Sequence, residues 1–166
     1  NGLPVTISPN NTTTYSLVEV EDDNDCRNAL NGDAIITIYD LPTAIMSGGG
    51  EICEDQFIPI AFTLQNGLPP YSVGYNVNGI PTSTIFNTSG VDTMMVSPST
   101  TTVYSLVDIS DAYCSNTAMG TVIVTVHPLP SASISGGDVI CADSTAQVDI
   151  IISTSSNAKP FNVIYS

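Results

Sequence analysis

The chain has 166 residues, a length that suits one or two ordinary domains, and 42% of them are hydrophobic, enough for a packed core. The 16 acidic residues stand against 2 basic ones, Arg27 and Lys159, giving a formal net charge of -14. This composition excludes nucleic-acid binding, which needs clustered Lys and Arg, and no apolar run approaches the roughly 18 residues needed for membrane insertion.

The first recognisable element along the chain is a Pro-led, Thr-rich stretch at residues 8–18, which returns at residues 97–107. The offset is 97 − 8 = 89, and Cys26 then matches Cys114 with an offset of 114 − 26 = 88. Further matches keep the same order: 34–38 with 122–126, 41–44 with 129–132, 52–53 with 140–141, and 70–73 with 160–163. Self-similarity at one period predicts tandem repeats of about 88 residues, the size of a small β-sandwich.

This period divides the chain into three parts. Residues 1–40 are the C-terminal part of one repeat, residues 41–128 a complete repeat, and residues 129–166 the N-terminal part of the next. We expect the chain to be an excerpt from a longer array. In an alternative interpretation, the two partial repeats complement each other between chains and build a domain across a head-to-tail joint.

Apolar residues inside the complete repeat alternate with a period of two, which is typical of strands with one buried face. Turn signals rich in Gly, Pro and Asn separate these runs. The pattern predicts seven strands, near residues 43–48, 57–65, 71–78, 80–88, 91–97, 102–110 and 120–127. We therefore predict an all-β fold of tandem immunoglobulin-like β-sandwich repeats.

Two tyrosines at equivalent positions, Tyr15 and Tyr104, stand early in the strand that follows the Thr-rich turn. A tyrosine corner belongs there, with the hydroxyl bonded back to the preceding turn, although an ordinary core aromatic gives the same pattern. The linkers at residues 40–42 and 128–130 contain Pro, which stops the hydrogen-bond ladder and keeps the linker extended. A semi-rigid rod is expected, with roughly 40 Å added per repeat.

Several of these motifs together resemble a known family of repeats. They are residues 41–49, 52–53, 69–73, 97–106 and 111–114, and they are similar to the Ig-like or PKD-like repeats of giant surface adhesins of Bacteroidota, including the mobile adhesins of gliding flavobacteria. The resemblance covers essentially the whole chain. It implies export through the type IX secretion system, an extracellular location at the bacterial cell surface, and a role in adhesion, gliding motility or surface filaments.

Each repeat carries one cysteine after its first strand (Cys53, Cys141) and one in its last hairpin turn (Cys26, Cys114). A disulfide within the repeat, Cys53 to Cys114, would stabilise the fold by about 4 kcal/mol through loop closure. However, these turns lie at opposite poles of an immunoglobulin-like sandwich, beyond disulfide reach. The alternative is a staggered link, in which the cysteine after the first strand of one repeat bonds to the turn cysteine of the next repeat. Cys141 and Cys26 hold these two positions in the repeats on either side of the complete one. Free thiols are a third arrangement.

Acidic residues gather near the expected joints between repeats. Hard carboxylate oxygens there could bind calcium, although a solvated acidic edge explains the same clusters and no known calcium loop is present. The calcium candidates are Asp22, Asp23, Asp25, Glu51, Asp55 and Asp111. No other cofactor is expected.

Two tripeptides, beginning at Asp92 and Asp143, look like the O-glycosylation signal of Bacteroidota, and this likeness implies Thr93 and Ser144 as acceptors. Asn10, Asn11 and Asn87 also fit the N-x-[ST] pattern, which is common by chance in Ser/Thr-rich chains.

No enzyme is expected. His127 is the single His, and it precedes a linker proline without any nucleophile motif nearby. Three functions remain: a stalk or filament segment, a carbohydrate- or surface-binding module, and an accessory region of a secreted hydrolase. The absence of Trp and the core-facing positions of most aromatic residues favour the stalk, whose partners would be neighbouring repeats and lateral or head-to-tail copies.

Overall fold

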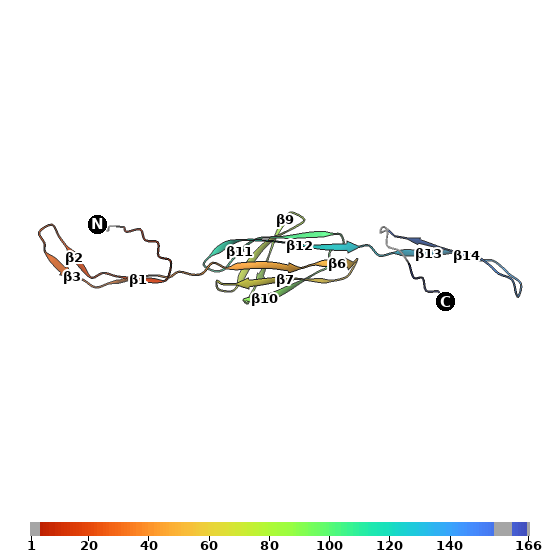
Figure 1. The fold of residues 1–166 in the computed structure, drawn as a ribbon, viewed down its shortest axis with the longest axis horizontal. Coiled ribbons are helices and arrows are strands. Elements are labelled where there is room, and N and C mark those ends of the chain that lie inside the picture. The colour runs from red at the N-terminus through yellow and green to blue at the C-terminus, as the bar shows by residue number, and fades with distance from the viewer. Residues whose placement is uncertain (1–3, 155–160, 166) are drawn as a thin grey trace.

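The structure is a computed structural model, and it describes residues 4–154 and 161–165. Within these ranges the chain is all-β, with fourteen strands and no helix. Accordingly, the described residues contain no helix that is long and apolar enough to cross a membrane. Figure 1 shows a central β-sandwich with one arm of short strands extending from each side of it.

Eight strands in two sheets form the central sandwich. The three-stranded sheet has the order β10 (Gly90–Val96), β7 (Ile58–Gln65), β5 (Thr43–Gly48). The five-stranded sheet has the order β6 (Gly50–Cys53), β12 (Ser115–His127), β11 (Thr102–Ser110), β8 (Tyr71–Val77), β9 (Ile80–Phe86). Six of the seven predicted strands agree with these bounds to within two residues, and the last begins earlier than predicted, at Ser115.

The core lies between the two sheets and is built from alternate residues of each strand. Because successive side chains on a strand point to opposite faces, apolar residues two apart reach the same core. Ile60 and Phe62 of β7, Val73 of β8, Ile109 of β11 and Val124 of β12 are all 0% exposed. Each such side chain stabilises the fold by about 1.5–3 kcal/mol relative to an exposed position.

The chain changes sheets at three consecutive glycines. β5 pairs with β7 up to Gly48, and β6 begins at Gly50 and pairs in parallel with the end of β12. All three glycines have positive φ, and Gly49 has a φ of 75°. A Cβ on Gly49 would lie 2.5 Å from Cγ1 of Val122 and 2.6 Å from the backbone oxygen of Ile123. Only glycine therefore fits this crossing. Cys53, which the sequence predicts to lie between the first two strands, is the last residue of β6.

The linkers to the two arms leave the sandwich at opposite poles. At the N-terminal pole, the start of β5 at Thr43 lies beside Gln65, the end of β7, and the β11–β12 turn lies beside the start of β8. At the C-terminal pole, the end of β12 at His127 lies beside Cys53. β12 has 13 residues and connects the two poles over about 40 Å, at roughly 3.3 Å per residue.

The two arms repeat the strand pairing of the central sandwich. The C-terminal arm pairs β13 (Ser131–Gly136) with β14 (Val148–Ser153), and the N-terminal arm pairs β1 (Thr13–Ser16) with β4 (Asp33–Ile36) and β2 (Glu19–Glu21) with β3 (Arg27–Ala29). Ser131 pairs with Ser153 as Thr43 pairs with Gln65, and both partners differ by 88 (131 − 43 and 153 − 65). The β13–β14 hairpin is thus the β5–β7 pair displaced by one period.

The N-terminal arm matches β11 and β12 in the same way, including an irregularity. The central pair skips one residue of β12, because Leu106 pairs with Gly120 and Asp108 with Thr117. In the arm, Ser16 pairs with Asp33 and Glu19 with Ala29, which also leaves one extra residue on the second side. Register and irregularity therefore agree between the N-terminal arm and the β11–β12 pair of the central sandwich.

Replacing Gly49 with Ala should destabilise the sandwich by about 3 kcal/mol, because it combines an unfavourable positive φ with overpacking against β12. Gly79 is the matched control, since its φ is 84° and a Cβ there would meet nothing within 4 Å. Gly79→Ala should cost only about 1 kcal/mol from backbone strain. Urea denaturation of both variants measures the difference, and equal losses would contradict a steric role for the crossing.

Candidate functional site

The N-terminal joint of the complete repeat is a set of specific contacts between the linker and the β11–β12 turn. The rings of Tyr39 and Tyr113 stack with centroids 4.1 Å apart and planes 10° apart. Sγ of Cys114 lies 3.9 Å from the backbone oxygen of Tyr39. Nδ2 of Asn116 donates to the backbone oxygen of Pro42 at 3.1 Å, and Pro42 is buried. The linker is therefore fixed against the pole of the sandwich.

Asp111 organises this pole through both of its carboxylate oxygens. Oδ2 accepts the backbone N–H of Leu68 at 2.8 Å, and Oδ1 accepts the backbone N–H groups of Cys114 at 2.7 Å and Tyr113 at 2.8 Å. The three N–H donors hold the pKa of Asp111 below its usual value, because hydrogen bonds to the carboxylate stabilise its charged form. Leu68 contributes the largest effect, followed by Cys114 and Tyr113. One side chain thus ties the β7–β8 loop to the β11–β12 turn.

Asp22 has the same role in the N-terminal arm, where it stands at the position of Asp111. Its Oδ1 accepts the backbone N–H of Asn24 at 2.9 Å and that of Cys26 at 3.0 Å. The bonds from Asn24 and Cys26 lower the pKa of Asp22. The aspartate and the cysteine that follows it therefore form a similar turn in the N-terminal arm and in the central sandwich.

The C-terminal joint is held mainly by the backbone. The N–H of Glu54 donates to the backbone oxygen of His127 at 2.8 Å, which extends the β6–β12 pairing to the last residue of β12. Nε2 of His127 lies 3.1 Å from Oε2 of Glu51, and both side chains are largely exposed. An exposed pair of this kind contributes little stability.

The structure decides between two of the cysteine arrangements. All four cysteines are free thiols. Cys53 is the ladder partner of His127 at one end of β12, and Cys114 precedes Ser115 at the other end. The two are thus about 40 Å apart at ordinary strand spacing, whereas the Cα atoms of a disulfide lie within about 7 Å. In this fold the length of β12 therefore separates Cys53 and Cys114 of one repeat too far for a disulfide. The staggered link and free thiols both stay open as predictions.

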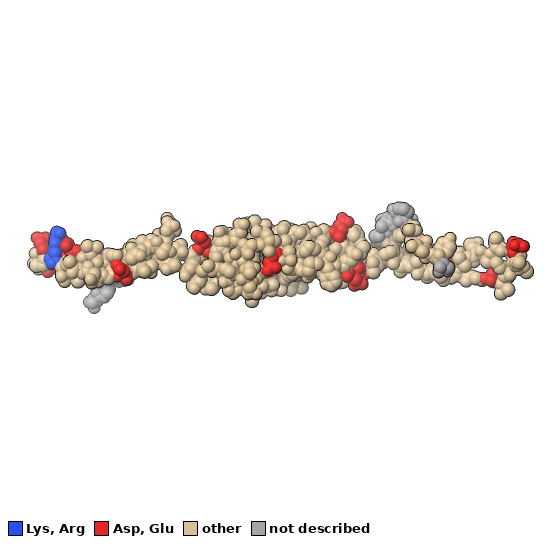
Figure 2. Space-filling model, turned by 90° about the horizontal axis from the view of Figure 1, so that it is seen from below, with Lys and Arg blue, Asp and Glu red and all other residues tan. Residues whose placement is uncertain are grey.

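The calcium candidates do not converge. In the described part of the chain, no group of three or more His, Cys, Asp or Glu side chains is placed to hold a metal ion. Asp22 and Asp111 bind backbone N–H groups, while Glu51 and Asp55 lie at the opposite pole from Asp111. Asp23 and Asp25 share the exposed turn of Asp22. Figure 2 shows acidic side chains spread along this face. In the N-terminal arm, Arg27 forms ion pairs with Glu19 at 3.4 Å and Glu21 at 3.1 Å.

A hydrogen bond from a tyrosine hydroxyl back to a preceding turn is found at a different residue and in a different strand. The hydroxyl of Tyr71, at the start of β8, donates to the backbone oxygen of Asn66 at 2.6 Å. Among the described residues Tyr104 has no hydrogen-bond partner, and burial raises its pKa, with a further contribution from Tyr75. Tyr15, its counterpart, is partly exposed and likewise unbonded within the described ranges. Tyr104 is therefore the core aromatic that the sequence left as the alternative.

The predicted glycan acceptors are accessible. Thr93 lies on the edge strand β10 with its side chain exposed, and Ser144 lies exposed in the turn after Cys141. Glycosylation of either residue stays a prediction.

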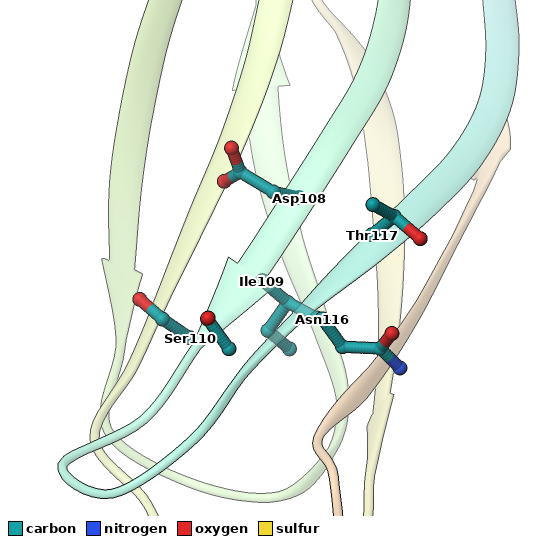
Figure 3. A pocket seen from close by; sticks show the side chains of 6 residues that line it. Asp108, Ile109, Ser110, Asn116 and Thr117 are labelled. Carbon is teal, nitrogen blue, oxygen red and sulfur yellow. The ribbon is translucent and has the colours of Figure 1, made fainter.

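A hollow of about 360 Å³ lies over the β11–β12 hairpin near the N-terminal pole, lined by Asp108, Ile109, Ser110, Ser115, Asn116 and Thr117. Figure 3 shows that Asp108 and Thr117 point in different directions and that the polar side chains do not face a common point. His127 stands at the other end of β12. Asp108 and Ser110 give the hollow a carboxylate and a hydroxyl, but these side chains do not converge as a base and a nucleophile in one site would.

No known protein-family model matches the chain. A curated protein to which it is similar is the nucleoporin POM152 of Saccharomyces cerevisiae, with 26% identity over 161 residues. The match covers 88% of this chain and 12% of the yeast protein. The similarity therefore concerns a small segment of that relative.

The carboxylate of Asp111 makes stability depend on pH. Its pKa lies below the ordinary 3.8, so it stabilises the fold above pH 3.8, and this contribution is lost as the pH falls through the lower, folded-state value. Asp111→Asn should unfold at lower urea concentration at pH 7, because one amide oxygen cannot replace both carboxylate oxygens. It should also lose less stability than the native chain on acidification.

Asp40→Asn is the control for charge, because Asp40 lies in the linker and has no hydrogen bond among the described residues. Urea midpoints measured from pH 7 to pH 3 should be nearly the same for Asp40→Asn and the native chain. If the urea midpoint of Asp111→Asn falls as much between pH 7 and pH 3 as that of the native chain, the organising role of Asp111 is contradicted.

Proposed function

We propose that the chain is a non-catalytic structural segment of a secreted cell-surface adhesin, in which tandem Ig-like repeats form an extended stalk or filament. The observation that carries this proposal is the geometry of the joints. One linker enters the sandwich at the N-terminal pole and the other leaves at the C-terminal pole, about 40 Å away along β12. Repeats connected in this way add length instead of folding back.

The strand order supports the Ig-like part of the proposal. One sheet contains β5, β7 and β10, and the other contains β8, β9, β11 and β12. An immunoglobulin sandwich divides its strands in the same way, with A, B and E in one sheet and C, C′, F and G in the other. The first strand splits between the sheets at Gly49, so that β6 lies beside β12. The resemblance to Bacteroidota adhesin repeats adds the extracellular location and the adhesive or gliding role.

The joints support a stiff stalk over a flexible string. At the N-terminal joint, stacked tyrosine rings, a buried proline and a hydrogen bond from Asn116 restrict the linker. Segments with several such contacts move together, whereas a linker without them would behave as a flexible chain. The nucleoporin similarity is compatible with a segment of a larger protein, since the match spans 12% of the yeast protein.

A carbohydrate-binding module is the second candidate, and exposed aromatic rings are the feature that would favour it. Phe57 is 69% exposed at the C-terminal pole. However, the hollow near the N-terminal pole has no aromatic lining, and Tyr113 is already stacked on Tyr39. The hollows that do contain an aromatic side chain lie on the two arms, where Tyr15, Phe161 and Tyr165 contribute to the lining.

Tyr113→Ala should loosen the N-terminal joint. The tyrosine stack is worth about 0.5–1.5 kcal/mol beyond the area that it buries, so its loss should increase the motion of the N-terminal arm relative to the sandwich. NMR amide relaxation would show this as separate tumbling of the two parts. Tyr113→Phe keeps the ring and should behave as the native chain. If the arm and the sandwich tumble in Tyr113→Ala as they do in the native chain, the tyrosine stack does not restrict the joint.

The chain should show no saturable binding to polysaccharides. A glycan microarray followed by calorimetry on any positive sugar measures this directly, with Phe57→Ala to test the exposed ring. Binding that saturates and is lost in Phe57→Ala would replace the passive-stalk proposal by the binding-module one.

A further inference from the structure

Two tyrosines of the N-terminal joint are stacked in a way that brings equivalent atoms together. Tyr39 belongs to the linker and Tyr113 to the β11–β12 turn, and their ring planes are 10° from parallel with centroids 4.1 Å apart. The side chain of Tyr113, first through a hydrogen bond and then through its charge, raises the pKa of Tyr39. Such a hydrogen bond places both hydroxyls at the same end of the stack. The ring carbons beside the hydroxyls therefore also lie close to one another.

The backbones that carry these two rings are held in place. The N–H of Tyr113 donates to Oδ1 of Asp111 at 2.8 Å, and the N–H of Asp111 donates to the backbone oxygen of Cys114 at 2.9 Å, which closes the turn. On the linker side, Sγ of Cys114 lies 3.9 Å from the backbone oxygen of Tyr39, and Pro42 is buried shortly afterwards. The rings are therefore preorganised for a reaction with each other.

The stacked pair is also open to solvent. Tyr39 is 37% exposed and Tyr113 is 61% exposed. By contrast, Tyr75 and Tyr104 both face the core and are only 7% and 6% exposed. Among the described residues, Tyr39 and Tyr113 are the one pair of tyrosines whose rings stack. A dissolved oxidant can thus reach two phenol rings that already touch.

Phenol rings in this arrangement undergo a specific oxidation. A one-electron oxidant removes one electron and one proton from each hydroxyl group, which leaves two phenoxyl radicals. Each radical carries unpaired electron density on the ring carbons beside its oxygen, and two such carbons form a carbon–carbon bond. The hydrogens on these two carbons then move to the oxygens, which restores both phenols. The coupling needs the close approach of these carbons, which the stack provides.

We propose that Tyr39 and Tyr113 form an oxidative cross-linking site, at which a carbon–carbon bond between the two rings fastens the linker to the sandwich. The oxidant is hydrogen peroxide acting through a haem peroxidase. One peroxide molecule takes up the two electrons and two protons that the tyrosines release and becomes two water molecules. The proposal goes beyond the stalk role, because it depends only on contacts within one joint.

The bond would turn a contact at the joint into a covalent connection. Tyr39 precedes β5 and Tyr113 follows β11, so the cross-link closes a loop that includes strands of both sheets. A cross-link between residues far apart in the sequence restricts the unfolded chain more than the folded one, which favours folding. The linker would also stay attached to the pole when the chain is bent or pulled.

The first test treats the purified 166-residue chain with a haem peroxidase and with hydrogen peroxide in excess over the four thiols, which also consume peroxide. After proteolysis, mass spectrometry should find peptides joined through Tyr39 and Tyr113 with the loss of two hydrogens. This product should exceed the product of any other tyrosine pair about tenfold or more, because proximity replaces a bimolecular encounter. Equal amounts of products at Tyr15 or Tyr165 would overturn the proposal.

Dilution and a matched pair of variants test whether the stack itself reacts. The yield per chain should not change on dilution, since both rings belong to one molecule, and a yield that falls would refute the site. Tyr113→Phe keeps the ring but has no hydroxyl to oxidise, so the blue fluorescence of dityrosine should be lost. Tyr15→Phe removes a partly exposed tyrosine outside the stack and should keep that fluorescence. Equal fluorescence of the two variants would contradict the assignment.

A stability measurement tests whether the bond fastens the linker. The urea midpoint of the cross-linked chain should be higher than that of the untreated chain. Tyr113→Phe, treated with the same peroxidase and peroxide, controls for oxidation of the thiols and should show no such rise. An unchanged midpoint in fully cross-linked native chain would show that the bond does not fasten the linker to the sandwich. This outcome is independent of the glycan and relaxation experiments, which test the stalk role.

Discussion

A strand pair with one apolar face needs a second sheet to cover that face, and this requirement governs every part of the chain. In the central repeat it is met locally, because β5, β7 and β10 pack on the five-stranded sheet and leave residues such as Phe62 and Val73 without solvent contact. In the arms, strands of the same register hold the same kinds of side chain with one face open. Counterpart residues are therefore buried in the central sandwich and exposed in the arms because only the sandwich has the second sheet, although their local sequences are alike.

The poles show how the carboxylates of an acidic chain can order its joints through hydrogen bonds from backbone N–H groups. A carboxylate beside backbone N–H groups gains charge-assisted hydrogen bonds, which are stronger than those between neutral groups. Asp111 uses three such donors to connect two loops, and Asp22 uses two of them in the equivalent turn. The acidic residues at the joints are therefore partly structural. Pro42 and the Tyr39–Tyr113 stack then convert an ordered pole into an ordered junction.

The strand positions of the central repeat followed from the sequence because period-two alternation is a direct consequence of strand geometry. Two features did not. The β6 strand is short, and its parallel partner is far away in the sequence, so Gly49 marked the crossing without revealing where the chain went. The hydroxyl of Tyr104 has no partner within the described residues, while Tyr71 bonds Asn66, because hydrogen bonding depends on loop geometry that recurrence alone does not specify. The separation of Cys53 from Cys114, in contrast, followed from topology.

The crossing at Gly49 also determines how the repeat would carry tension. The chain enters at the N-terminal pole through β5 and leaves at the C-terminal pole from β12, and β6 runs parallel to the last residues of β12. Force along the axis would pull β6 toward one pole and β12 toward the other. The hydrogen bonds between Gly50–Cys53 and the end of β12 would then be loaded together in shear, since they lie across the direction of pull. Without the three glycines, β5 could not cross, and tension would reach the core without passing through this clamp. The glycine run is therefore required by the packing of the crossing, and in the proposed stalk it would also determine how load passes through the repeat.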